Sequence, residues 1–139
     1  MSFLNNPRNT AEVLCHAQKI HRTRRIKNGE TIYPGAIVAL DPEAGTVEPA
    51  GKNPGSVVLG RAEGYTGDGK VIVKTGVFKY ENGNGDETLT LKDLNKTVYV
   101  LDDQTVGRIG GSNKIIAGVL RDIDHDGQVV VELGNLKLD

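Results

Sequence analysis

Short apolar runs separated by turns rich in glycine and aspartate make up most of the chain from residue 31 onward. The stretch 97–134 holds four such runs, each closed by a Gly or Asp turn. Runs of about four to eight residues rich in Val and Ile, bounded by Gly, Asn and Asp, are typical of strands and hairpins. About ten short runs without crossover helices predict an all-β fold, an antiparallel sandwich or barrel.

Part of this pattern occurs twice. The segment 57–76 aligns without a gap on 115–134, and the identities fall on turn glycines and on valines of one strand face. Those are the positions that a duplicated β-unit keeps for backbone and packing reasons. We therefore predict an internal repeat, although two unrelated Asp-Gly hairpins would also look alike. The matched residues are Gly60/Gly118, Asp68/Asp126, Gly69/Gly127, Val71/Val129, Val73/Val131 and Gly76/Gly134.

The first 30 residues differ from the rest, because they hold six of the 17 Lys and Arg residues and only two of the 18 acids. We interpret 1–10 as an extended N-terminal arm, and 11–30 as a strand followed by a charged loop that ends in an Asn-Gly turn. Residues 31–139 are then a single β domain. The spacing of Thr90 and Asp93 matches a capping box, so at most one short helical turn is expected, at 91–95.

Composition narrows the function classes. With 139 residues and a net charge of −1, the chain gives no general argument for binding nucleic acid or a membrane surface. A single cysteine excludes an internal disulfide framework. No apolar run approaches the length of a membrane span and no signal peptide is recognised, so we expect a soluble protein that is intracellular where it is synthesised.

The sequence Asp122-Ile-Asp124-His-Asp126-Gly matches the first half of an EF-hand loop. A complete loop needs a bidentate Glu at its twelfth position, where this chain has Leu133. The corresponding stretch of the first copy lacks these acids. We therefore predict a hairpin turn, and a weak calcium ion at the three carboxylates stays open.

No other pattern predicts catalysis, a cofactor or a metal. Adjacent residues of a strand point to opposite faces, so Cys15 and His16 do not form a dyad. Asp102 and Asp103 are typical of a turn that caps backbone amides. The segment 107–112 lacks the Lys-Thr and the helix of a phosphate loop, and is interpreted as a flexible connection. The sequence therefore predicts that the protein is not an enzyme.

Arg22, Arg24 and Arg25 form the one notable charge cluster. A nucleic-acid site would have more basic residues and interleaved aromatic ones. Contact with an acidic protein surface, or an ordinary solvated loop, explains the cluster better.

The order of several segments resembles the small cement, or decoration, proteins of the capsids of tailed phages, particularly of Mu-like phages and prophages. The resemblance extends from Arg8 to Leu133, although residues 19–27 are more charged than is usual in that family. The segments that carry it are Arg8-Asn9-Thr10, IYPGAIVAL (32–40), LGRAE (59–63), GVFKYEN (76–82), VYVLDDQTV (98–106) and AGVLRDID (117–124).

This resemblance implies a β-rich, generally trimeric structural protein that binds the outside of the head, where it contacts the major capsid protein. It implies synthesis in the host cytoplasm and a final place on the capsid exterior. On this hypothesis the arm, with Arg8, Asn9 and Thr10, and the basic cluster of Arg22, Arg24 and Arg25 bind the capsid. The alternative is a virion-surface module that binds a sugar, calcium or a host surface.

Overall fold

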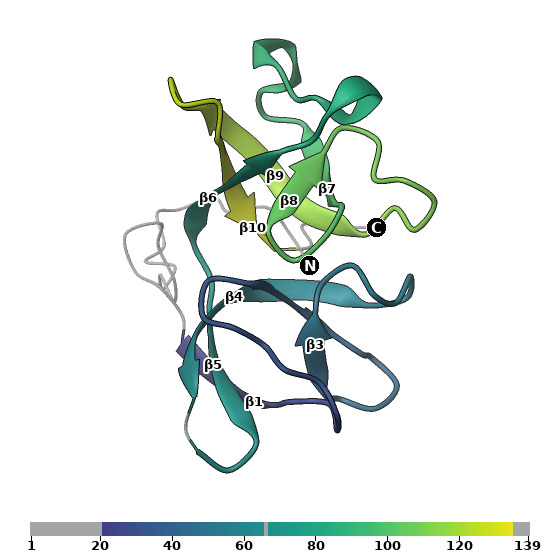
Figure 1. The fold of residues 1–139 in the computed structure, drawn as a ribbon, viewed down its shortest axis with the longest axis vertical. Coiled ribbons are helices and arrows are strands. Elements are labelled where there is room, and N and C mark those ends of the chain that lie inside the picture. Colours follow the sequence, from purple (N-terminus) through teal and green to yellow (C-terminus); the bar gives the residue numbers. More distant parts are fainter. Residues whose placement is uncertain (1–20, 66, 135–139) are drawn as a thin grey trace, which may run out of the picture.

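The computed structural model describes residues 21–65 and 67–134. This part of the chain forms ten strands and two short 3-10 turns, and it is all-β, as the sequence predicts (Figure 1). None of its helical segments is long and apolar enough to cross a membrane. The elements are β1 (His21–Arg25), β2 (Ile37–Leu40), β3 (Val47–Pro49), β4 (Val57–Tyr65), β5 (Lys70–Lys74), β6 (Val77–Asn82), η1 (Gly85–Glu87), η2 (Leu91–Asp93), β7 (Thr97–Val100), β8 (Thr105–Gly107), β9 (Ile116–Ile123) and β10 (Val129–Leu133).

The strands form two groups of five, which we call the first unit (β1 to β5) and the second unit (β6 to β10) (Figure 1). The first unit is a sheet in the order β1-β5-β4-β2-β3, and a parallel bridge between Ile26 and Val47 links its two edges. The second unit is a closed barrel in which β6 pairs in parallel with β8. The remaining strand pairs in both units are antiparallel.

The two units repeat each other strand for strand, which confirms the predicted duplication and extends it from one hairpin to all five strands. The β4–β5 pairing skips Glu63 and the β9–β10 pairing skips Arg121, which are equivalent residues in the aligned copies. The β2–β4 and β7–β9 pairings skip a residue at the next equivalent place, beside Gly60 and Gly118. Shared bulges are strong evidence of a repeated unit, because a bulge is a specific feature of a strand pair.

Gly60 and Gly118 show why the repeat keeps these glycines. A Cβ atom on Gly60 would lie 2.4 Å from the carbonyl oxygen of Lys74, and one on Gly118 would lie 1.9 Å from that of Glu132. Lys74 and Glu132 are themselves equivalent residues. At these glycines the backbones of β4 and β5, and of β9 and β10, therefore approach too closely for any side chain.

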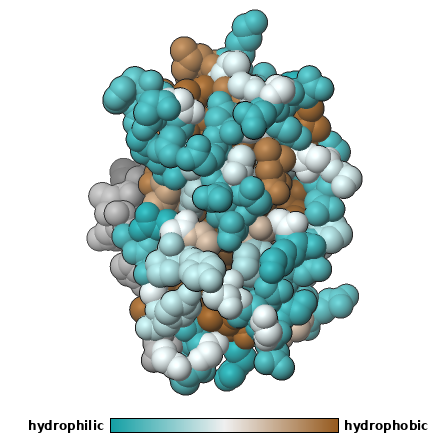
Figure 2. All heavy atoms as spheres, in the orientation of Figure 1, coloured by the Kyte–Doolittle hydropathy of each residue, from teal (hydrophilic) through white to brown (hydrophobic). Residues whose placement is uncertain are grey.

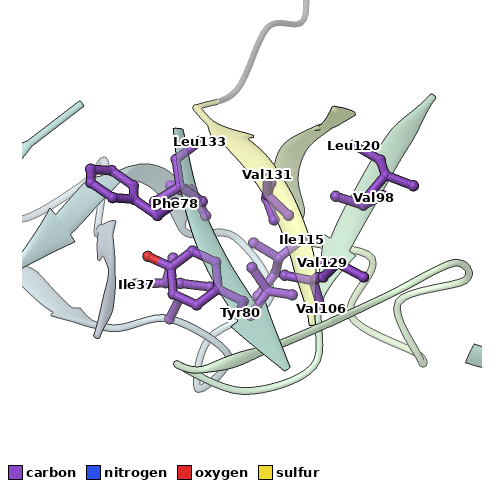
Figure 3. Packing of buried hydrophobic residues seen from close by; sticks show 14 of the residues in the cluster. Ile37, Phe78, Tyr80, Val98, Val106, Ile115, Leu120, Val129, Val131 and Leu133 are labelled. Atoms are coloured by element: carbon purple, nitrogen blue, oxygen red, sulfur yellow. The ribbon is translucent and has the colours of Figure 1, made fainter. Parts of the chain in front are cut away.

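The main core fills the second unit and continues into the first. Ile37 from β2 belongs to the same buried cluster as Phe78, Tyr80 and Leu120 of the barrel, and Figure 3 shows Ile37 beside Tyr80. Arg61 of β4 also lies over the ring of Phe78, 4.0 Å from its centroid. A smaller cluster within the first unit contains Ile32, Ala36, Val38, Val47, Ala62, Val71 and Val73.

Two local predictions meet different outcomes. The charged loop expected after residue 20 is wrong for its first part, because His21–Arg25 is a strand that pairs with β5 over its whole length. The capping box is confirmed: the Thr90 side chain accepts a hydrogen bond at the start of η2, and Asp93 accepts one from the Thr90 backbone. The other 3-10 turn, η1, was not expected from the sequence. The proposed arm at 1–10 lies outside the described residues.

Candidate functional site

The basic cluster of the sequence lies on β1, at one edge of the first sheet. Arg22 is paired with Val73 and Arg24 with Val71, both on β5. Paired residues of neighbouring strands point to the same face of a sheet. Since Val71 and Val73 are buried, the two arginines point to the side of the sheet that holds the smaller core. Thr23 and Arg25 point to the opposite face.

The second unit shows how unusual this is. There, the strand equivalent to β1 is β6, on which Phe78 faces Val131 and Tyr80 faces Val129. Phe78 and Tyr80 are only 8% and 5% exposed and complete the core of the barrel. The first unit has Arg22 and Arg24 at these two positions, one exposed and the other half-buried. The edge strand β1 therefore carries arginines where the equivalent strand β6 carries aromatic core residues. We call this edge, with Arg22, Arg24 and Arg25, the charged rim.

The three arginines have no acidic partner within the described part of the chain. Only Arg24 makes a side-chain hydrogen bond there, from Nη1 to the carbonyl oxygen of Thr23 at 3.2 Å. The lysines on neighbouring β5 are neutralised, since Lys70 Nζ lies 3.7 Å from Asp68 and Lys74 Nζ lies 3.6 Å from Glu63. Within residues 21–65 and 67–134, nothing thus neutralises the three positive charges on β1. Arg8, Asn9 and Thr10 of the proposed arm lie outside the described residues.

Most of the molecular face in Figure 2 is hydrophilic, and its hydrophobic side chains form separate groups. Large exposed apolar residues include Tyr33, Tyr65 and Leu91. The Tyr65 hydroxyl donates a hydrogen bond to the Ile32 carbonyl oxygen, so part of this surface serves the fold. Among the described residues, the positive charge of β1 is therefore a clearer sign of a binding surface than any group of exposed apolar side chains.

The aspartates of the EF-hand-like stretch hold a cation from the protein itself. The Lys79 ammonium lies 2.8 Å from an Asp124 carboxylate oxygen and 2.9 Å from one of Asp126. The hydrogen bonds and charge of Lys79 lower the pKa of both aspartates, and they in turn raise the pKa of Lys79. Within residues 21–65 and 67–134, no three His, Cys, Asp or Glu side chains are grouped to hold a metal ion. The stretch is a hairpin turn, as the sequence predicts, and Lys79 competes with any calcium ion.

The segment 107–112 leads from the end of β8 toward β9, as the sequence predicts for a connection, and hydrogen bonds fix part of its backbone. Three consecutive backbone N–H groups, of Ile109, Gly110 and Gly111, donate to the Glu87 carboxylate at 2.7, 3.0 and 3.0 Å. Partial burial raises the pKa of Glu87, but these hydrogen bonds outweigh that effect and the net pKa is lowered. The Glu87 carboxylate therefore accepts from three successive amides and holds this loop in place.

A buried carboxylate that sequence reasoning missed lies on β3. Glu48 is fully buried, accepts a hydrogen bond from the Asn53 side-chain amide, and lies 3.8 Å from the Lys27 ammonium. Lys27 and Asn53 help to line an open pocket of about 360 Å³. Glu48 therefore anchors the loop before β4 through its Oε2 atom, while its buried Oε1 atom has no hydrogen-bond partner among the described residues and only the Lys27 ammonium nearby. A single polar residue in a short strand gives no sequence signal for this role.

Comparison with family models, with curated proteins and with solved structures found no match. Cys15 and His16 lie outside the described residues. Among the residues that the structure describes, the charged rim on β1 is therefore the strongest candidate for a binding surface.

Proposed function

We propose that this protein is a non-enzymatic capsid decoration protein, which binds the outer surface of a phage head and stabilises contacts between major capsid protein subunits. The proposal combines the resemblance of its sequence segments with one structural observation. That observation is the set of three arginines on an edge strand, without acidic partners in the described residues.

The roles of other charged groups in the fold support a binding role for the arginines of β1. Asp124 and Asp126 hold Lys79, and Glu87 holds the loop at 109–111, so these carboxylates maintain the fold. Within the part of the chain that the structure describes, the arginines of β1 have no comparable internal role. Positive charges on a rim accelerate encounter with an acidic surface and orient the complex.

Stabilisation of a head would come from added interface area. A specific protein interface buries on the order of 1,200–2,000 Å² in total. On the proposed model the protein is a homotrimer, so that several such contacts act together and strengthen binding through avidity. Assembly onto the capsid exterior follows synthesis in the host cytoplasm.

We expect the purified protein to co-sediment with expanded heads that lack it, up to a fixed number of copies per head. Because exposed charges are screened by salt, the affinity should fall when the salt concentration is raised from about 0.1 M to about 1 M. Heads that already carry the protein are the control and should bind no more. The proposal is wrong if the protein stays in the supernatant at low salt.

A further inference from the structure

We propose that the outer edge of β1, which pairs with no other strand of the described residues, binds an extended, acidic segment of the capsid protein, which adds to the first sheet as a further strand. This inference rests on the proposed function and specifies how the contact is made. Strand addition gains affinity from backbone hydrogen bonds and specificity from side chains.

The hydrogen bonds at the end of β1 define which backbone groups point away from β5. In an antiparallel pair, alternate residues point both backbone groups toward the partner strand, and the residues between them point both groups away. The Ile26 N–H donates to the Gly69 carbonyl oxygen on the β5 side at 2.9 Å. The Lys27 N–H points the other way and donates to Val47 at 2.8 Å. By this alternation, the backbone N–H and C=O groups of Arg22 and Arg24 point toward β5. The backbone groups of Thr23 and Arg25 point outward.

The repeat shows that this edge is more open than its counterpart. In the second unit, β6 pairs with β8 at both Glu81 and Asn82. The equivalents of those residues in the first unit are Arg25 and Ile26, of which only Ile26 is bridged to β3. Within the described residues, no strand pairs with the outer edge of His21–Arg25. The Arg24 side chain bonds the Thr23 carbonyl, as expected for an oxygen without a strand partner.

The charges of β1 select the partner. A second copy of β1 would place arginines opposite arginines, and like charges across a strand pair are destabilising. A segment with acidic residues on both faces would instead meet Arg22 and Arg24 on one side and Arg25 on the other. Backbone pairing also distinguishes this mode from nonspecific attraction to nucleic acid, which needs only the side-chain charges.

Thr23→Pro tests the inference, because proline removes the outward N–H and leaves the N–H groups that face β5 in place. Proline is tolerated on an edge strand when its nitrogen faces outward. The matched control is Thr23→Val, which keeps the N–H and the preference for a strand. We expect Thr23→Pro to bind heads about tenfold more weakly than Thr23→Val, a loss of roughly one backbone hydrogen bond.

Both variants should have the circular dichroism spectrum and unfolding temperature of the wild type. Equal binding by the two variants would overturn strand addition and leave the proposed function intact, whereas absence of binding by the wild type would overturn both. If Thr23→Pro does not fold, hydrogen exchange on the wild type replaces it. The amides of Thr23 and Arg25 should then become protected on heads, and unchanged exchange at both would overturn the inference.

Discussion

Gly118→Ala is expected to destabilise the protein by about 3 kcal/mol, at the upper end of the usual cost of overpacking. The added methyl group would lie 1.9 Å from the Glu132 carbonyl oxygen, which is a backbone atom that cannot rotate away. Relief of the clash would separate β9 from β10 where Gly118 pairs with Leu133. Chemical denaturation followed by circular dichroism measures the loss directly.

The first unit supplies both a second test and a control. Gly60→Ala places a methyl group 2.4 Å from the Lys74 carbonyl oxygen and should destabilise by about 2 kcal/mol. Gly64, on the same strand, has no atom within 4 Å of the added methyl group, so its replacement should change stability by less than about 0.5 kcal/mol. Equal effects at Gly60 and Gly64 would contradict the explanation from close strand approach.

Glu87→Ala should cost about 3 kcal/mol at neutral pH, because three N–H groups lose a charged acceptor. Glu87→Gln is the matched variant, since it keeps one acceptor oxygen and should lose less. Denaturation of both variants beside the wild type measures the difference. A loss below about 0.5 kcal/mol for Glu87→Ala would show that the loop at 109–111 does not depend on this carboxylate.

The pH dependence of this contribution has a definite sign. The folded protein lowers the pKa of Glu87, so the stabilisation is present above the ordinary carboxyl pKa and disappears as the pH falls through the lowered value. The stability difference between wild type and Glu87→Gln should therefore shrink between about pH 6 and about pH 3. A difference that grew on acidification would contradict a lowered pKa.

The repeated scaffold could be predicted from the sequence because its physical requirements are local. Gly60 and Gly118 sit where strands approach closely, and Val71 and Val129 face a core, so both positions leave a visible pattern. The choice between a sandwich and a closed barrel, and the repeat of all five strands, could not be predicted, because they depend on pairings between distant strands. The parallel bridge of Ile26 to Val47 is one example.

The candidate site was predicted as a charge cluster but not as a strand. His21–Arg25 contains no apolar residue, so it lacks the alternation that identifies strands, and its conformation comes from pairing with β5. Glu87 binds amides 22 to 24 residues away, and Lys79 binds an aspartate 47 residues away. Such contacts are decided by the fold, and composition or local spacing gives no signal for them.

Binding to heads by a charge-reversed protein tests the central claim, that β1 is the contact surface. The variant is Arg22→Glu, Arg24→Glu and Arg25→Glu, and the control reverses the exposed Lys92, Lys96 and Lys114 of the second unit, which changes the net charge equally. We predict that co-sedimentation shows an affinity about 100-fold lower for the β1 variant, equivalent to about 2.7 kcal/mol, and little change for the control. Equal losses in the two variants, or undiminished binding by the β1 variant, would contradict the account.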